Sequence, residues 1–327
     1  MAAFSASLAA VLLTVQLAEA LPAILRVPQS AWNDLNKTIN GNLHLGKPEF
    51  LPCFTSYENG QTTRPSTPNL SSCRTASSGK TDGPSIASYF GGYEVPNWSQ
   101  CQANNTGCSI SALLPLEAAA LAQTCHQGSV PSYYIDSTNP KHMHAGMMFA
   151  KKYGVPLVVK NTGHDHRGRS SAPFSLAIWT HNIQPEISFS NDFLPSGCPK
   201  STGFETMTYG AGHEFGQLYD AAHAKGYMLS GGAALSVGAA GGWLQGGGHG
   251  VLAPNYGLGV DNVVELNALL PNGSVVTANR CRNQDVFFAM RGGGGGTFGI
   301  LLNVTSHVYP EVPMQARGAP SLILKRC

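Results

Sequence analysis

Charged side chains are scarce in this sequence. Asp, Glu, Lys and Arg make up 12% of its 327 residues, which is about half of the share usual in soluble proteins. The formal net charge is +2, so the sequence lacks the concentrated positive charge of proteins that bind nucleic acid. Hydrophobic residues make up 43%, which is enough to build a substantial core.

Motifs of several enzyme classes are also missing. The sequence contains no G-x-x-x-x-G-K-[S/T] phosphate loop and no G-x-S-x-G nucleophile turn. It also has no G-x-G-x-x-G segment in the strand–helix setting of a dinucleotide-binding βαβ unit. After residue 20, no run of residues is apolar for long enough to predict a transmembrane helix. P-loop, α/β-hydrolase and Rossmann enzymes are therefore poor matches, and no membrane span is expected.

Glycine, in contrast, is abundant and clustered, with 38 residues in the chain. Residues 155–159 form an apolar, β-branched run that predicts a buried strand. The turn at 161–171 follows and contains Gly163, His164 and Gly168. Because successive backbone N–H groups in such a turn form a site for anions, one hypothesis is that it holds the pyrophosphate of FAD, with His164 beside the flavin ring. The alternative is a polar surface loop with an incidental histidine.

Residues 1–20 are typical of a secretory signal peptide. An apolar run at 8–17 is too short to span a bilayer, and Ala18-Glu19-Ala20 fits a cleavage site. No Lys or Arg precedes the run, so a buried N-terminal helix is the alternative. Sequons at Asn36, Asn69, Asn97, Asn104, Asn272 and Asn303 agree with export. We expect a secreted, extracellular glycoprotein.

The eight cysteines predict disulfides, because none forms a C-x-x-C metal pattern. Proximity in the chain suggests the pairs Cys53–Cys73 and Cys101–Cys108, although sequence does not fix the pairing. Cys327 has no evident partner. Residues 21–119 are rich in turn-forming residues and predict an irregular, disulfide-tied N-terminal region.

Periodic helix and strand patterns dominate the chain after this region. Helices are predicted at 113–124, 140–153, 214–225 and 285–291, and strands at 132–135, 155–160, 175–179, 205–209, 263–270, 274–277 and 300–309. Asn272-Gly273 indicates a hairpin turn. This order favours an α/β or α+β layered domain at 120–310, followed by an atypical tail at 311–327. We expect Trp179, Trp243 and Phe298 in the core.

Histidines could also bind metal. His164-Asp165-His166 would form half of such a site, but no partner residues stand out elsewhere. His249, between two glycines, is more typical of a packed or capping histidine than of a catalytic one.

Five ordered segments together resemble one protein family. They are 161–165 with 168–171, 179–181, 246–250, 256–263 and 291–299. This part of the chain, about residues 120–310, resembles the PCMH-type FAD-binding domain of the vanillyl-alcohol-oxidase flavoprotein superfamily. Within that superfamily it is similar to the berberine-bridge-enzyme-like branch, especially secreted fungal alcohol and carbohydrate oxidases.

The resemblance implies a fold of two α+β subdomains with FAD between them, and a covalent bond from His164 to the flavin 8α-methyl group. Members of this branch often have a second, cysteinyl link, but Ala234 stands at that position here, so a single attachment is expected. The other cofactor-binding residues implied are Asn161, Thr162, Gly163, Asp165, Gly168, Ser170, Ser171, Gly238, Gly241, Gly248, His249, Asp261, Asn262 and Gly299.

The implied activity is that of a secreted FAD-dependent oxidoreductase. Hydride would pass from an alcohol or carbohydrate-like substrate to flavin N5, with molecular oxygen as the acceptor. The catalytic base is not identified. A second hypothesis is a secreted flavin-fold glycoprotein without turnover, because family members continue into a substrate domain whose sequence does not follow residue 310 here.

A truncated product is therefore expected to lack the wall that shields a flavin ring from water. We predict weak FAD binding or poor folding, and negligible oxidase turnover by the 327-residue chain, whereas a longer form of the same gene would be active. Hydrogen peroxide production against a panel of alcohols and oligosaccharides measures this, and robust turnover would contradict it.

Overall fold

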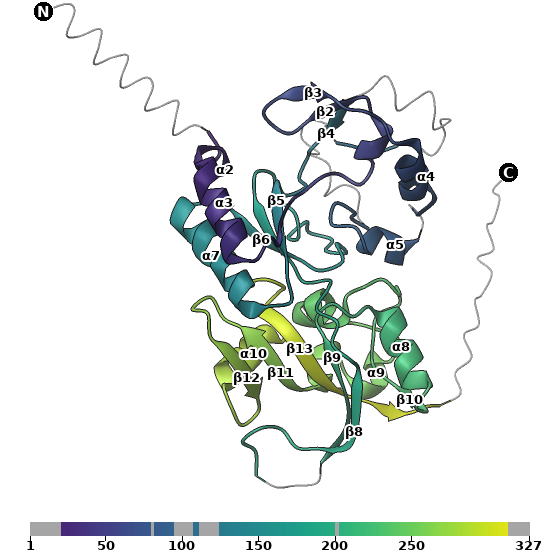
Figure 1. Cartoon of the computed structure of the whole chain (residues 1–327). Helices are drawn as coiled ribbons and strands as arrows, with labels where there is room; N and C mark the ends of the chain where they lie inside the picture. The colour runs from purple at the N-terminus through teal and green to yellow at the C-terminus, as the bar shows by residue number, and fades with distance from the viewer. Residues whose placement is uncertain (1–20, 80–81, 95–106, 111–123, 200–202, 313–327) are drawn as a thin grey trace, which may run out of the picture.

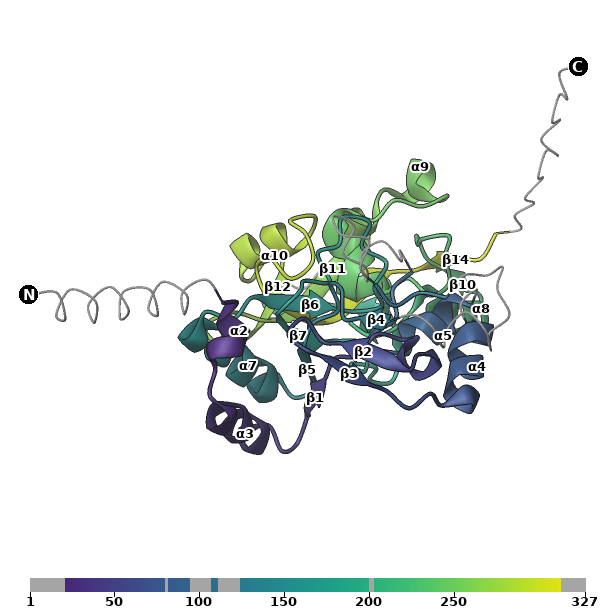
Figure 2. The ribbon, with the colours of Figure 1, turned by 90° about the horizontal axis from the view of Figure 1, so that it is seen from above.

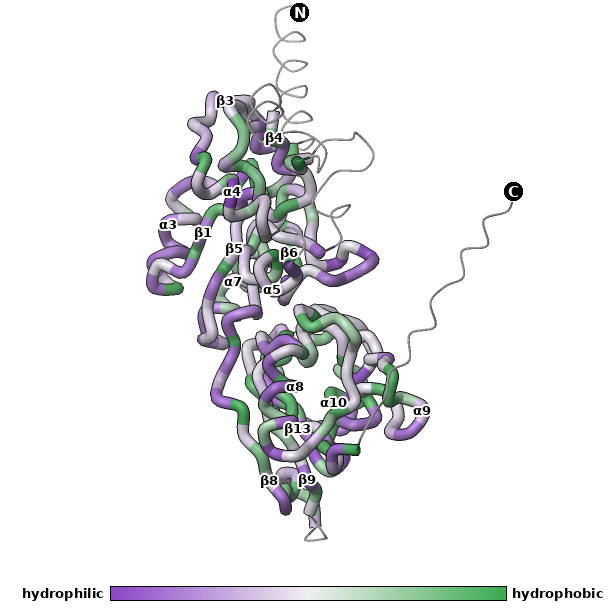
Figure 3. The backbone as a smooth tube through the Cα atoms, turned by 90° about the vertical axis from the view of Figure 1, so that its right-hand side faces the viewer, coloured by the Kyte–Doolittle hydropathy of each residue, from purple (hydrophilic) through white to green (hydrophobic). Residues whose placement is uncertain are grey.

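The computed structural model describes residues 21–79, 82–94, 107–110, 124–199 and 203–312. The predicted signal peptide, most of the predicted helix at 113–124 and nearly all of the atypical tail lie outside these residues. The chain forms two α+β subdomains, which appear as two lobes in Figure 3. No helix among the described residues is long and apolar enough to cross a bilayer.

The first subdomain is built on a four-stranded sheet in the order β1-β5-β7-β6. Strands β5, β7 and β6 are parallel, and β1 pairs antiparallel with β5. The strands are β1 Leu43–Leu45, β5 Tyr133–Asp136, β6 Leu157–Lys160 and β7 Leu176–Trp179, and the helices beside them are α2 Ala23–Arg26, α3 Gln29–Thr38 and α7 Pro140–Tyr153. The expected N-terminal region thus supplies one strand of this sheet.

Helix α7 begins and ends where its sequence predicts. The Asn139 side chain accepts a hydrogen bond from the Lys141 N–H, and Pro140 occupies the first turn. Gly154 ends the helix in the left-handed conformation, with φ +66°. Trp32 of α3 packs on Phe149 of α7, so both helices share one hydrophobic core on the sheet (Figure 1).

The second subdomain contains a five-stranded antiparallel sheet in the order β12-β11-β13-β9-β8. Its strands are β8 Ser188–Phe193, β9 Phe204–Gly210, β11 Val263–Leu269, β12 Val275–Asn279 and β13 Ile300–His307, and its main helices are α8 Phe215–His223 and α10 Gln284–Met290. Side chains from α8, α10 and the sheet form the largest buried cluster. The predicted hairpin is confirmed, because β11 and β12 are joined at Asn272-Gly273 and Gly273 has φ +87°.

Short elements connect and border these layers. They are η1 Leu51–Cys53, β2 Ser56–Glu58, β3 Thr63–Pro65, α4 Leu70–Gly79, α5 Gly83–Ala87, β4 Thr124–His126, β10 Tyr227–Met228, a π-helical turn η4 Ala239–Trp243, η5 Leu244–Gly246, α9 Ala253–Tyr256, η6 Gly259–Asn262 and β14 Tyr309–Pro310. Strands β3, β2 and β4 form a small separate sheet beside α4 (Figure 2).

Disulfides confirm one predicted pair and correct the other. Cys53–Cys73 is present, but Cys108 bonds to Cys125 rather than to Cys101. Nearness in the chain was the only basis for the Cys101–Cys108 pairing, whereas folding brings Cys125 on β4 next to Cys108. A third disulfide, Cys198–Cys281, connects the segment after β8 to the end of β12.

Two expected core residues differ in their surroundings. Trp179 is buried as predicted, but Phe298 is 48% exposed. Phe298 follows the five-glycine run and leans over Gly293, where an added Cβ would lie 2.5 Å from its ring. The prediction for Phe298 was therefore wrong, since this loop lies on the surface rather than under the sheet.

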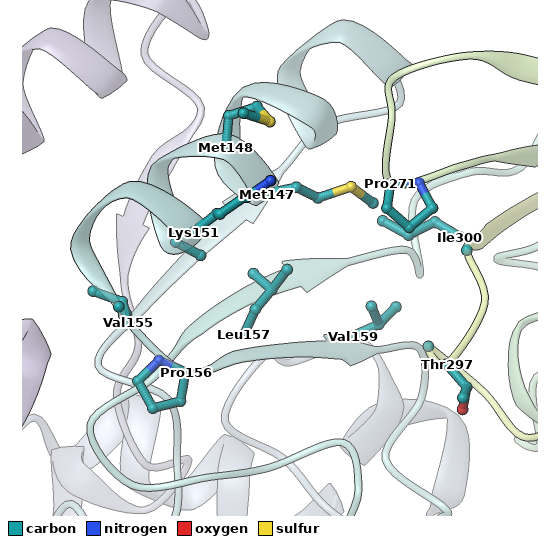
Figure 4. A pocket seen from close by; sticks show the side chains of 14 residues that line it. Met147, Met148, Lys151, Val155, Pro156, Leu157, Val159, Pro271, Thr297 and Ile300 are labelled. Atoms are coloured by element: carbon teal, nitrogen blue, oxygen red, sulfur yellow. The ribbon is translucent and has the colours of Figure 1, made fainter.

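A shared cluster joins the subdomains. Met143 of α7 and Ile178 of β7 pack with Ala211, Ile300 and Leu302 of the second subdomain. Beside it lies an apolar groove of about 540 Å³ between α7 and β6, bordered by Met147, Leu157 and Ile300 (Figure 4).

Breaking the long-range disulfide should destabilise the fold more than breaking a short-range one. Cys198–Cys281 closes 83 residues and Cys53–Cys73 closes 20, and the loop-closure entropy of the unfolded chain grows with that number. We expect the Cys198→Ser/Cys281→Ser double variant to lose roughly 4 kcal/mol of unfolding free energy, and Cys53→Ser/Cys73→Ser to lose less. Denaturant titration measures both, and the reverse order would contradict the assignment.

Candidate functional site

A cavity of about 820 Å³ lies at the junction of the subdomains. Its walls come from three segments far apart in the sequence, 159–170, 232–251 and 295–296. This volume lies within the range of cofactor and ligand sites. The residues predicted from sequence that line it are Asn161, Thr162, Gly163, His164, Asp165, Ser170, Gly238, Gly241 and His249, and Ala234 lies in the same wall.

The other predicted site residues do not line this cavity. Gly168 and Ser171 shape the turn, because the Ser171 N–H and hydroxyl both donate to the Gly168 carbonyl. Gly248 packs under Trp243, and its φ of +78° favours glycine. Gly299 lines the apolar groove beside α7 instead.

Asp261 and Asn262 stabilise a loop outside the cavity. Asp261 accepts a hydrogen bond from the Leu258 N–H at 2.9 Å. Asn262 donates to the Tyr256 and Leu258 carbonyls and accepts from the Tyr309 hydroxyl at 2.7 Å. Both side chains are thus engaged within the segment 256–262 and with β14.

An ion pair within the turn after β6 stabilises that turn. Asp165 accepts hydrogen bonds from both Nε and Nη2 of the Arg169 guanidinium, with 2.7 Å from Oδ1 to Nη2, and another from the Arg169 N–H. These bonds keep the pKa of Asp165 below its ordinary value. Gly163, with φ +97°, passes close to the Gly92 carbonyl, where a side chain would be strained.

Asn161 connects the turn to the glycine-rich segment. Its Nδ2 donates to the Thr180 hydroxyl and to the Ala211 carbonyl, at 2.9 and 2.8 Å. A Cβ on Gly238 would lie 1.8 Å from Asn161 Oδ1, and one on Gly241 would lie 2.2 Å from Nδ2. Only glycine leaves room for this amide at both positions, which explains part of the clustering seen in the sequence.

His164 is held by two residues that sequence reasoning missed. Its Nε2 lies 2.8 Å from Ser236 Oγ and 3.7 Å from Glu94 Oε1, and the Ser236 hydroxyl donates to Glu94 at 3.3 Å. Burial, together with the nearby His166 and Lys160, lowers the pKa of His164 to about 4. The imidazole is therefore neutral at physiological pH.

Lys160 is a buried amine beneath the turn. It is fully buried at the end of β6, and its Nζ lies over the rings of Phe90, Tyr93 and Trp179 at 5.0–5.7 Å. Burial lowers its pKa to about 7, while Glu49 acts in the opposite direction. Sequence gave no signal for this arrangement, because the aromatic partners come from two distant segments.

Two of the three residues considered as half of a metal site have other hydrogen-bond partners. Asp165 accepts a hydrogen bond from Arg169, and His164 is hydrogen-bonded to Ser236. Within the described ranges no group of three or more His, Cys, Asp or Glu side chains has the geometry to hold a metal ion.

The other expected core residue, Trp243, lies in the cavity wall and donates through Nε1 to the His249 carbonyl.

The sequence pattern of the FAD-binding domain family matches residues 131–279. An FAD-linked oxidoreductase of Phaeosphaeria nodorum is 38% identical over 283 residues, which cover 86% of this chain and 57% of that protein. An FAD-linked oxidoreductase of Aspergillus flavipes is 37% identical, over 90% of this chain and 48% of its own length. The chain thus spans about half the length of the curated relatives it matches.

A solved structure agrees with these relatives. The VAO-type flavoprotein MtVAO713 of Myceliophthora thermophila superimposes with a TM-score of 0.72 at 30% identity, over 87% of this chain and 47% of that protein. Sequence and fold point to the same conclusion: this chain carries an FAD-binding domain and, over the half of those proteins that it spans, shares the fold of the VAO-type flavoproteins.

Proposed function

We propose that this chain binds FAD in the cavity between its subdomains, through a single covalent bond to His164, as part of a secreted FAD-dependent oxidoreductase. One observation supports this most strongly. The turn at 161–170 and the segment 232–251 converge on one cavity that carries a neutral histidine in its wall. The relatives described above are FAD-linked oxidoreductases, so the cofactor class and the cavity agree.

The residues around the cavity fit such a cofactor. Gly242 and Gly246 line it, and open space lies where a Cβ would stand on either residue. Backbone can therefore approach a ligand closely there. Arg167 lines the same cavity and suits the negative charge of a pyrophosphate. Asn161 Oδ1 is buried without a hydrogen-bond partner among the described residues, so it can accept one from a ligand.

When bound, a flavin supplies the redox chemistry by accepting a hydride from substrate carbon at N5. This chain's residues would position the cofactor and tune its surroundings. His164 would anchor the cofactor, and the backbone of the glycine-rich segment 232–251 would contact it closely. We propose an alcohol or carbohydrate-like substrate and molecular oxygen as the acceptor, in line with the sequence resemblance.

Export and glycosylation belong to the same proposal. Asn69 and Asn272 are exposed; Asn69 directly precedes α4, where it accepts a hydrogen bond from the Ser72 N–H, and Asn272 lies in the hairpin turn. Three disulfides are present, as expected for an oxidising compartment. Loss of mass on treatment of the secreted protein with an N-glycosidase would support this part, and an unmodified cytosolic protein would contradict it.

Covalent attachment is tested by substitution of His164. Wild-type protein incubated with FAD should retain yellow colour after denaturation, with one flavin adduct on the peptide that contains His164. His164→Ala should release all flavin on denaturation, because no other side chain is proposed to form the bond. Mass spectrometry of proteolytic peptides measures both.

The matched control is His166→Ala, which removes the neighbouring histidine of the same turn and should retain the adduct. A flavin found on His166, on a cysteine, or on no residue of well-folded protein would refute the proposal.

Backbone approach is tested by adding single methyl groups in the cavity. Gly242→Ala and Gly246→Ala place a Cβ with no atom of the described residues within 4 Å, so the fold should persist while noncovalent FAD binding weakens by roughly tenfold, or about 1.4 kcal/mol. Gly216→Ala, on α8 outside the cavity, is the control, since its Cβ meets only ordinary contacts. Calorimetric titration with FAD measures this, and unchanged affinity in both cavity variants would contradict it.

A further inference from the structure

We propose that Glu94 and Ser236 are positioning residues that keep the proton of neutral His164 on Nε2, so that Nδ1 is the nitrogen that bonds to the flavin. The inference rests on the proposed function for the bond itself, but the proton position can be measured without any cofactor. Neither residue was among those predicted from sequence, although Ser236 lies between Ala234 and Gly238.

The side chains of His164, Ser236 and Glu94 form a packed hydrogen-bonded chain. Ser236 is 4% exposed and lies between the other two, 2.8 Å from His164 Nε2 and 3.3 Å from Glu94 Oε1. Gly83 of α5 backs the pair so closely that an added Cβ would lie 2.2 Å from Ser236 Oγ and 2.6 Å from Glu94 Oε1. The segment 82–94 therefore fits onto the cavity wall at this point.

The direction of the hydrogen bonds follows from the number of protons available. Ser236 has a single hydroxyl proton, and an ionised Glu94 can only accept. Because that proton goes to Glu94, Ser236 Oγ must accept at its other contact. His164 Nε2 then carries the imidazole proton, and Nδ1 keeps its lone pair.

Protonation of Glu94 would reverse the direction of these hydrogen bonds. A protonated Glu94 can donate to Ser236, which then donates to Nε2, and the imidazole proton moves to Nδ1. Burial raises the pKa of Glu94, the hydrogen bond from Ser236 acts in the opposite direction, and Asp82 adds to the rise. Glu94 in turn raises the pKa values of Glu214 and Glu49. Burial is the main cause that lowers the pKa of His164, and His166 and Lys160 act in the same direction.

The bond-forming step balances with dioxygen as oxidant. Nδ1 of His164 forms a bond to the 8α-carbon, one C–H bond of that methyl group breaks and its proton leaves to solvent. Bonding at Nδ1 makes the imidazole cationic until the Nε2 proton passes to Ser236 while the Ser236 proton passes to Glu94. The two electrons of the broken bond enter the flavin and are then transferred to dioxygen, which is reduced to hydrogen peroxide.

The first test is the tautomer of His164 in the protein without FAD. Nitrogen-15 spectra of histidine-labelled protein distinguish protonated from bare ring nitrogens, and His164→Ala assigns the signals. Wild-type protein at neutral pH should show protonated Nε2 and bare Nδ1. Ser236→Ala should show a mixture of tautomers. A wild-type spectrum with the proton on Nδ1 would overturn the inference whether or not flavin attaches.

The second test is the rate of covalent attachment after FAD is added. Ser236→Ala and Glu94→Ala should lower this rate by about tenfold, the factor that one hydrogen bond of ordinary strength provides. Noncovalent FAD affinity and thermal unfolding should stay unchanged, which separates positioning from a folding defect. Ser190→Ala on β8, outside the cavity, is the matched control and should attach at the wild-type rate.

The dependence on pH adds a signature that a purely structural role would not produce. Wild-type attachment should slow as the pH falls through the raised pKa of Glu94, while His164, with its pKa of about 4, is still neutral. Ser236→Ala should slow only near pH 4, where His164 itself becomes protonated. Identical pH profiles, or attachment through Nε2 in wild type, would overturn the inference and leave the proposed function standing. Absence of any adduct in wild type would instead contradict the proposed function.

Discussion

The structure depends on the close contact between Asn161 and two glycines at the junction of the subdomains. Asn161 follows β6 of the first subdomain, and its amide donates to the Ala211 carbonyl of the second. Gly238 and Gly241 approach this amide so closely that any side chain on them would collide with it. The contact therefore fixes the position of the turn at 161–170 relative to the glycine segment that faces it across the cavity.

Burial is the main cause that keeps the histidine at the same junction neutral, and His166 and Lys160 add to its effect on the pKa. Lys160 is itself buried among aromatic rings immediately before the turn. On the other side of His164, Ser236 forms a hydrogen bond to Glu94. A neutral imidazole is a nucleophile, whereas a protonated one is not, so the surroundings of His164 suit covalent chemistry.

Local patterns in the sequence predicted the elements whose signals are local. Asn272-Gly273 gave the hairpin, Pro140 and Gly154 gave the limits of α7, and the turn with His164 follows its strand as expected. Contacts between distant segments were not predictable. Ser236 and Glu94 are 142 residues apart, and nothing in either segment indicates that they meet.

Contacts between distant segments also explain the other differences between the sequence predictions and the structure. Pairing of β1 with β5 draws residues 43–45 into a sheet that the turn-rich composition of 21–119 did not suggest. Cys125 reaches Cys108 through the pairing of β4 with β2, a parallel contact that sequence patterns do not reveal. Asp261 and Asn262 belong to a family motif, yet their side chains stabilise a loop rather than line the cavity.

The central claim is that one cavity between the subdomains holds the flavin at His164. A crystal structure of the full chain reconstituted with FAD tests it most directly. The account predicts flavin density between the turn at 161–170 and the segment 232–251, continuous with Nδ1 of His164, and Ser236 still within hydrogen-bond distance of Nε2. Flavin density elsewhere, for example in the apolar groove beside α7, or a flavin in this cavity that His164 does not contact, would contradict it.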